Sequence, residues 1–284
     1  MDLPVVLIKL RDYIFWFGPV YLIAIALGAT AELALTRRLG LNISGEGSAS
    51  AHAGLLHRLW WYLAGRPLSP PPLSFRLYIW LGVSSRSLSW VALLMTAALS
   101  WPLSLLRIGA ALILASLLAA LVPLFVSAKS SQGTAAPIFA HEFVGPGPSV
   151  AADWWRALKQ RFDQSINDVT LGAVLAGVLI GLTGDTYALL APGLEAPLYY
   201  LSGPVIGTLS MLAPGPDAPI IAALQTRGLE GVAFTFMLAV CAAPLGLVIG
   251  IKKLFGLRTA AVYTLVSWVM VAAAAWLLNL VLST

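Results

Sequence analysis

The chain has 284 residues, of which 59% are apolar and only 10% are charged. Soluble domains carry about 25% charged residues, so a chain with so few charges cannot cover a water-facing surface. Its mean hydropathy of +0.88 indicates an outer surface that meets lipid. The net charge of +5 would favour nucleic-acid binding in a soluble protein. Here the basic residues cluster at the ends of apolar stretches, where they mark membrane topology and contact anionic lipid.

The first half of the chain contains three apolar stretches that we expect to cross the membrane, at residues 13–35, 75–99 and 103–126. Each comes close to the roughly 20 apolar residues that span a hydrocarbon core. They lack the strict alternation of a transmembrane barrel, so helices are the only spanning form that remains. Residues 84–87 interrupt the second stretch, which predicts either a broken helix or two short helices that meet there.

A polar segment, residues 128–167, divides the chain into a first transmembrane half, residues 1–127, and a second half, residues 168–284. We expect this segment to be a cytoplasmic linker. The second half repeats the plan of the first, because it contains further apolar stretches and a shorter pair interrupted by proline and glycine. The predicted spans are residues 169–190, 232–251 and 259–282, and the shorter pair, residues 198–212 and 220–225, predicts a re-entrant hairpin.

Short motifs recur at nearly the same spacing in the two halves, which predicts an internal duplication. Gly28-Ala29-Thr30-Ala31-Glu32 and Gly181-Leu182-Thr183-Gly184-Asp185 share the pattern Gly-x-Thr-x-acid. Trp80-Leu81-Gly82-Val83 likewise aligns with Met237-Leu238-Ala239-Val240. Because each half has an odd number of full spans beside a broken or re-entrant helix, we expect two inverted structural repeats in an all-α transmembrane bundle.

The distribution of Lys and Arg predicts the orientation, because cytoplasmic loops are enriched in both residues. An extracytoplasmic N-terminus places most of them, in residues 36–76, 128–167 and 252–258, on the cytoplasmic side and leaves Lys9, Arg11, Arg107 and Arg227 outside. The opposite orientation reverses this distribution. We therefore expect both termini outside the cytoplasm, in a multi-pass protein of the cell membrane.

Inverted repeats with helices interrupted near the middle of the membrane are typical of transporters. The segment Ala213-Pro214-Gly215-Pro216-Asp217-Ala218-Pro219 interrupts the second half in this way. Asp217 suits the position before a helix and Pro219 suits the first turn, so the next helix is expected to begin with free N–H groups. Such a helix end forms a local positive site in a low-dielectric medium.

Three apolar motifs carry a resemblance to a known family. They read Val91-Ala92-Leu93-Leu94-Met95-Thr96-Ala97-Ala98-Leu99, Pro216-Asp217-Ala218-Pro219-Ile220-Ile221-Ala222-Ala223-Leu224 and Ala242-Ala243-Pro244. With these motifs, most of residues 74–126 and 168–282 resembles the predicted permease family whose best-known members export organoarsenicals. The resemblance implies an all-helical permease.

The first half departs from this family in its cysteines. The first half of this family carries a cysteine pair beside a proline, and the members that handle arsenicals hold the metalloid with thiols. Residues 45–73 occupy that stretch here and contain no cysteine, and Cys241 is the single cysteine of the chain. The resemblance therefore implies a permease but weakens the interpretation as an arsenical exporter.

Ionisable residues inside a membrane are costly and are candidate functional residues by default. Asp217 is interpreted as a helix cap, as a substrate ligand or as both. Glu32 and Asp185 lie near span ends, so interfacial solvation and a proton or substrate role both stay open. Arg86 either pairs with a carboxylate at a helix break or snorkels to the interface. The predicted substrate-binding residues are Asp217, Thr183, Asp185, Thr30, Glu32 and Arg86.

No motif for a catalytic or metal-binding centre appears in the sequence. It has no Gly-rich phosphate loop, nucleophile elbow or zinc-helix motif. His52 and His57 are five residues apart and do not share a helical face. We therefore expect no enzyme activity, no cofactor and no metal.

Two functional hypotheses from different classes remain. The first is a permease that moves a small solute or ion through a site between the two repeats. The second is a non-transporting membrane subunit that anchors or scaffolds a complex. The expected partners are the solute, membrane lipid and optionally further copies of the chain as a homo-oligomer, but no nucleic acid.

Overall fold

The computed structural model describes residues 3–38, 75–126, 149–181, 197–210, 212 and 214–283. Every regular element in these ranges is an α-helix, which confirms the all-α prediction for this part of the chain. The helices are α1 (Leu3–Arg38), α3 (Phe75–Ser87), α4 (Trp90–Leu99), α5 (Trp101–Phe125), α6 (Val150–Gly181), α8 (Pro197–Leu209), α9 (Ala218–Gln225), α10 (Glu230–Ala242), α11 (Leu245–Phe255) and α12 (Leu257–Ser283).

Five segments of the described chain are long and apolar enough to cross a membrane, which indicates a multi-pass membrane protein. They are Leu3–Ala31, Trp101–Phe125, Val150–Gly181, Glu230–Phe255 and Leu257–Leu277. Large apolar side chains also lie on the outside of the bundle. Phe15 and Trp16 on α1 are 75% and 65% exposed, as expected where lipid takes the place of water.

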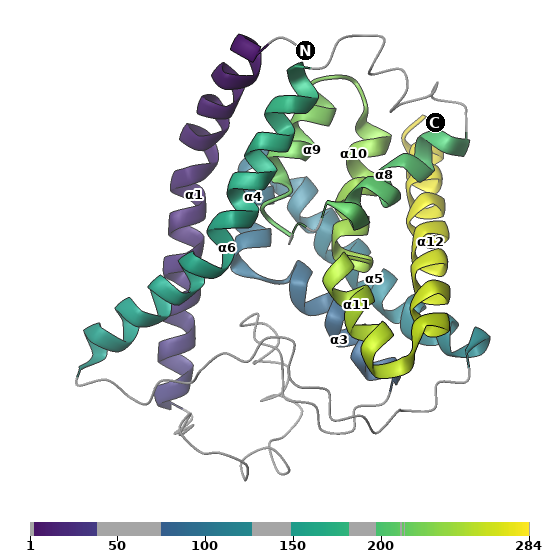
Figure 1. The fold of residues 1–284 in the computed structure, drawn as a ribbon, viewed down its shortest axis with the longest axis horizontal. Coiled ribbons are helices and arrows are strands. Elements are labelled where there is room, and N and C mark those ends of the chain that lie inside the picture. The colour runs from purple at the N-terminus through teal and green to yellow at the C-terminus, as the bar shows by residue number, and fades with distance from the viewer. Residues whose placement is uncertain are drawn as a thin grey trace.

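Helices α1 and α6 lie side by side and antiparallel (Figure 1). The Tyr21 hydroxyl lies 2.8 Å from Ser165 Oγ. Further along α1 and closer to the start of α6, Trp154 Nε1 donates a hydrogen bond to Thr30 Oγ1 at 3.0 Å. Helix α1 therefore begins at the end of the bundle where α6 ends, at the top of Figure 1.

Helix α6 begins at Val150, so residues 150–167, which we expected to belong to the linker, are helical. Apolar side chains follow one another at three- or four-residue spacing in this stretch and form one helical face. They pack against a cluster that includes Phe17 and Tyr21 of α1, and they are Leu158, Phe162, Ile166 and Val169. The polar residues between them obscured this face, because their number made the stretch resemble a loop.

Two of the predicted spans are broken into pairs of helices. In the span at residues 75–99, Ser89 precedes α4 and its side chain accepts a hydrogen bond from the Ala92 N–H at 3.2 Å. Two short helices thus meet in this span, as one of the two alternatives predicted, but residues 84–87 are the last turn of α3 and the break lies directly after them, at Leu88 and Ser89. The span predicted at residues 232–251 is likewise two helices, α10 and α11, because Pro244 has no N–H to continue the helical pattern.

Each broken pair is followed by a long helix. Helices α3, α4 and α5 contain 13, 10 and 25 residues. Helices α10, α11 and α12 contain 13, 11 and 27 residues. The two triplets thus have the same order of helices with nearly the same lengths.

Helix α10 forms the centre of the bundle, and its residues 236–242 are completely buried. Helix α8 packs closely on α10 through Gly203 and Gly207, where an added Cβ would clash with Thr235 and Ala239. The outer ends of α8 and α9 both lie toward the top of Figure 1, and the connection between them lies deeper in the bundle. This connection carries the candidate site.

Candidate functional site

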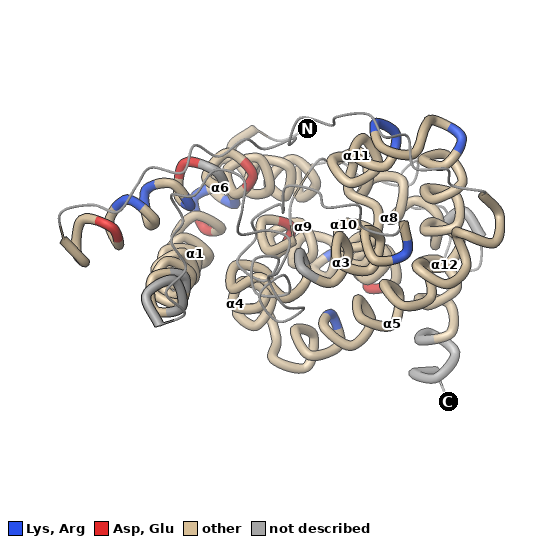
Figure 2. Tube along the Cα trace, turned by 90° about the horizontal axis from the view of Figure 1, so that it is seen from below, with Lys and Arg blue, Asp and Glu red and all other residues tan. Residues whose placement is uncertain are grey.

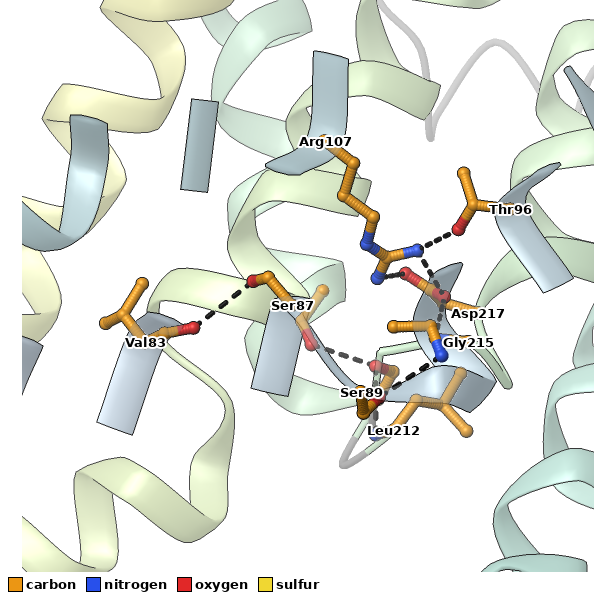
Figure 3. Close-up of polar contacts among 11 residues, drawn as sticks. Val83, Ser87, Ser89, Thr96, Arg107, Leu212, Gly215 and Asp217 are labelled. Atoms are coloured by element: carbon orange, nitrogen blue, oxygen red, sulfur yellow. Dashed lines mark hydrogen bonds and ion pairs between the residues drawn. The ribbon is translucent and has the colours of Figure 1, made fainter. Parts of the chain in front are cut away.

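A salt bridge between Arg107 and Asp217 lies in the interior of the bundle (Figure 3). Arg107 comes from α5, and Asp217 is the residue before α9. Arg107 Nη2 lies 2.7 Å from Asp217 Oδ2 and Nη1 lies 3.1 Å from Oδ1, so the guanidinium binds the carboxylate with both terminal nitrogens. Both side chains are completely buried, which makes this a full ion pair without direct contact with water or lipid.

Further hydrogen bonds tie the pair to the surrounding helices. Arg107 Nη1 also donates to Thr96 Oγ1, in the last turns of α4, at 2.6 Å. The Gly215 N–H donates to Asp217 Oδ1 at 2.7 Å. The Cys241 side chain of α10 lies beside the guanidinium, and Arg107 Nε has no hydrogen-bond partner within the described ranges. The pair therefore joins α4, α5, α10 and the segment before α9.

Two glycines allow neighbouring helices to close on residues 214–217. Gly215 has a φ of +108°, in the region that favours glycine, and an added Cβ would lie 2.8 Å from the Val91 carbonyl carbon of α4. On the other side, a Cβ at Gly172 of α6 would clash with the Pro216 carbonyl oxygen. Helices α4 and α6 thus hold this segment between them, with Asp217 directed at Arg107.

Asp217 precedes α9 as predicted, but its side chain does not cap the helix. The first-turn N–H groups are also occupied, which corrects the expectation that they are free. The Ala218 N–H donates to the Gly215 carbonyl at 2.9 Å, and those of Ile220 and Ile221 donate to the Asp217 carbonyl at 3.0 Å. Since Pro219 has no N–H, the cationic group at this position is the Arg107 guanidinium and not the end of the helix.

Of the other predicted site residues, Thr30 lies in the contact between α1 and α6. It is exposed, and its hydroxyl donates to the Ala26 carbonyl at 2.8 Å and accepts from Trp154. Thr183 and Asp185 lie outside the described residues. Glu32 belongs to α1 and Arg86 to the end of α3, and their side chains are outside the described part as well.

Arg107 is the site residue that the sequence analysis missed. We assigned it to the extracytoplasmic surface, whereas it is completely buried. The misassignment arose because Arg107 lies less than two turns from the start of a long span and was counted with the helix-end charges. One signal does identify it: Arg107 is the single charged residue of α5. An isolated charge in a span requires a counter-charge within the membrane.

The described residues contain no group of three or more His, Cys, Asp or Glu side chains that could hold a metal ion. Comparison of the chain with protein-family models, with curated proteins and with solved structures gives no match. The functional argument therefore starts from the Arg107–Asp217 pair and from the helices that meet at it.

Proposed function

We propose that this protein is a membrane permease and that a small solute crosses the bilayer at the Arg107–Asp217 pair. The observation that carries this proposal is the complete burial of both charges among apolar helices. A buried ion pair is a poor source of stability, since apolar side chains of similar volume often serve as well or better. Charges that are retained inside a membrane therefore point to a role in transport.

The interrupted helices support the same proposal. The break between α3 and α4, the connection between α8 and α9 and the break between α10 and α11 leave backbone groups without helical partners. Inside a membrane such irregular backbone is tolerated where protein or a polar path surrounds it. Transporters use interrupted helices of this kind to form a solute site near the middle of the bilayer. The resemblance of residues 74–126 and 168–282 to a permease family points in the same direction.

We further propose that the two halves are inverted repeats with both termini outside the cytoplasm. The equal order of helices in the two triplets, α3–α5 and α10–α12, supports a duplication, and the antiparallel α1 and α6 support inversion. The start of α1 and the end of α12 lie at one end of the bundle. Basic residues gather toward the opposite end, seen in Figure 2, at the start of α6 and around α11; Lys252, Lys253 and Arg258 are exposed there.

Single cysteines at Ser149 and Ser283, in a Cys241→Ser background, test this topology. We expect an impermeant thiol reagent added to intact cells to label the cysteine at position 283 and not the one at position 149. Labelling of both positions from the same side would contradict the inverted arrangement.

Transport itself is tested with the full chain in proteoliposomes. Uptake is measured for a panel of labelled sugars, amino acids, organic acids and inorganic anions, with and without a pH gradient. We expect saturable uptake of at least one class above protein-free liposomes. The Arg107→Met/Asp217→Leu variant should reduce that uptake by at least about tenfold, which corresponds to only about 1.4 kcal/mol of barrier. An inactive protein that purifies with one stoichiometric partner would instead favour the membrane-subunit hypothesis.

A further inference from the structure

We infer, on the premise that the chain is a permease, that its solute carries a carboxylate that takes the place of Asp217 on Arg107, while Asp217 takes up one proton. The inference names the class of solute, a small organic anion, and its coupling to protons. It rests on the geometry of the pair, on the different ionisation chemistry of its two members and on the donors that surround it.

The geometry comes first, because Asp217 already shows how a carboxylate fits Arg107. Its two oxygens accept hydrogen bonds from Nη2 and Nη1 at 2.7 and 3.1 Å, which is the fork-to-fork arrangement that planar carboxylates favour. A solute carboxylate needs only the same two contacts. Arg107 Nη1 also donates a hydrogen bond to Thr96 of α4. This bond can keep the guanidinium in place when Asp217 moves away.

The guanidinium also has one N–H donor without an acceptor in the described residues. Arg107 Nε is buried and has no hydrogen-bond partner in the described part of the chain. A buried N–H without a partner costs free energy, and a second acceptor on the solute, beside the carboxylate that binds Nη1 and Nη2, would satisfy it. The unsatisfied donor therefore favours an anion over a cation at this place.

Ionisation chemistry favours the same class of solute. A cationic solute would bind Asp217 and leave Arg107 without its counter-ion, and a guanidinium does not lose its charge in proteins. An anionic solute would bind Arg107 and leave Asp217 unpaired instead. A carboxylate in a low-dielectric site escapes its burial cost by taking up a proton. Only the anion leaves behind a group that can become neutral.

The charge balance then follows. Before the solute binds, the charges of Arg107 and Asp217 sum to zero. After binding, the solute carboxylate neutralises Arg107, and one proton from the aqueous phase neutralises Asp217, so the site is again neutral. One anion and one proton thus enter together, and the transport step moves no net charge. Of the other titratable groups, Cys241 on α10 lies beside the guanidinium. On α6, which packs against Pro216 through Gly172, Asp168 lies one turn before Gly172.

An anion-rescue experiment tests the inference on the purified full chain, apart from any transport. The variant is Asp217→Asn, which leaves the guanidinium without its internal carboxylate. We expect this variant to unfold at a lower temperature than wild type and to recover in sodium acetate, with a rise in Tm of roughly 2–4 °C at saturation relative to equal sodium chloride. The Arg107→Met/Asp217→Asn variant should show no such rise.

Several outcomes would overturn the assignment. They are an Asp217→Asn variant that ignores acetate, one that responds equally to chloride, and one that responds to inorganic phosphate but not to acetate. If Asp217→Asn does not fold, the same thermal unfolding measurement on the wild type in acetate tests the inference. Acetate should stabilise it more at about pH 5.5 than at pH 8, because binding requires a proton, and an absent or pH-independent effect contradicts the inference.

The two proposals fail separately. Transport of a sugar or a cation without acetate rescue would contradict the inference of an organic anion but would still support the permease proposal. Acetate rescue in a protein that transports nothing would sink the permease and leave an anion site. If both hold, uptake of labelled carboxylates into proteoliposomes should follow an inward proton gradient and should not respond to a membrane potential set with potassium and valinomycin.

Discussion

Helices α5 and α12 invite comparison, because each follows a broken pair of helices and each sends its seventh residue toward an interruption. On α12 that residue is Tyr263, whose buried hydroxyl donates to the carbonyl of Ala242 at the end of α10. On α5 it is Arg107, which binds Asp217 and Thr96. One interruption is thus closed by a neutral hydrogen bond and the other by a charged pair.

The difference separates the hydrogen bonds that an interrupted helix requires from a buried charge that it does not require. The last carbonyls of a helix need hydrogen-bond partners, and Tyr263 supplies one without any buried charge. Arg107 instead donates to two side chains, the Thr96 hydroxyl and the Asp217 carboxylate before α9. It bonds no carbonyl at a helix end in the described residues, so the need that Tyr263 meets does not explain the charge on the α5 side.

The largest effect that separates the two sides is expected from Arg107→Met. Loss of the guanidinium leaves Asp217 buried without a counter-ion, and breaking a buried pair costs about 3–5 kcal/mol. We expect the Arg107→Met/Asp217→Leu variant to regain most of this loss, because it buries no charge. Thermal unfolding in detergent measures both. A double variant that is no more stable than the single one would show that the unpaired carboxylate is not the cause.

A smaller effect is expected from Gly172→Ala, which tests whether the close packing around residues 214–217 holds Asp217 in place. The new methyl group would clash with the Pro216 carbonyl, and overpacking of this kind costs about 1–3 kcal/mol. Gly109→Ala is the matched control, since nothing lies within 4 Å of its Cβ position. If the two variants unfold at the same temperature, the packing of α6 on Pro216 does not constrain the site.

On the neutral side, Tyr263→Phe should cost less. It removes one hydrogen bond and leaves the Ala242 carbonyl without this donor, which corresponds to about 1 kcal/mol. Since no charge is involved, we expect solute uptake per folded molecule to stay near the wild-type value. Uptake that falls as far as in the Arg107 variants would make the two sides equivalent and remove the asymmetry.

The smallest effect is expected from Cys241→Ser, although Cys241 lies beside the guanidinium. The substitution changes little in volume, and a single thiolate cannot chelate a soft metalloid as a cluster does. Uptake should therefore remain within roughly threefold of wild type, about 0.6 kcal/mol of barrier. Complete loss of uptake in a folded Cys241→Ser protein would revive thiol-based transport.

Much of the fold was predictable because it depends on local patterns. The apolar stretches predicted the helices α5 and α12 to within a few residues. The polar run at residues 84–87 predicted a break that the structure places directly after it, at Leu88 and Ser89. The start of α6 was not predicted, since its helical face is hidden among polar residues that composition assigns to a loop. The sequence shows Pro244 in the middle of a predicted span. It does not show whether this proline kinks the helix or ends it, because that depends on the helices that pack around it.

The site was predictable only by half. Asp217 is identified by the prolines and glycine around it, which no continuous helix would tolerate. Arg107 is far away along the chain. Its position as the single charge of α5 indicates a counter-charge within the membrane, but not that Asp217 provides it. The pairing of the two follows from the packing of α4, α5 and α6 around residues 214–217, which is a property of the assembled bundle.

The separation of the two partners also sets the order in which the protein can be completed. Arg107 precedes Asp217 by 110 residues, and at synthesis rates of about 5–20 residues per second this separation takes roughly 5–20 s to traverse. During that interval α5 enters the membrane with an unbalanced charge, which its otherwise apolar sequence must outweigh. The Arg107–Asp217 ion pair therefore cannot form until the second half has been synthesised. A chain that stops before α9 keeps a guanidinium that has no counter-ion from residues 214–217.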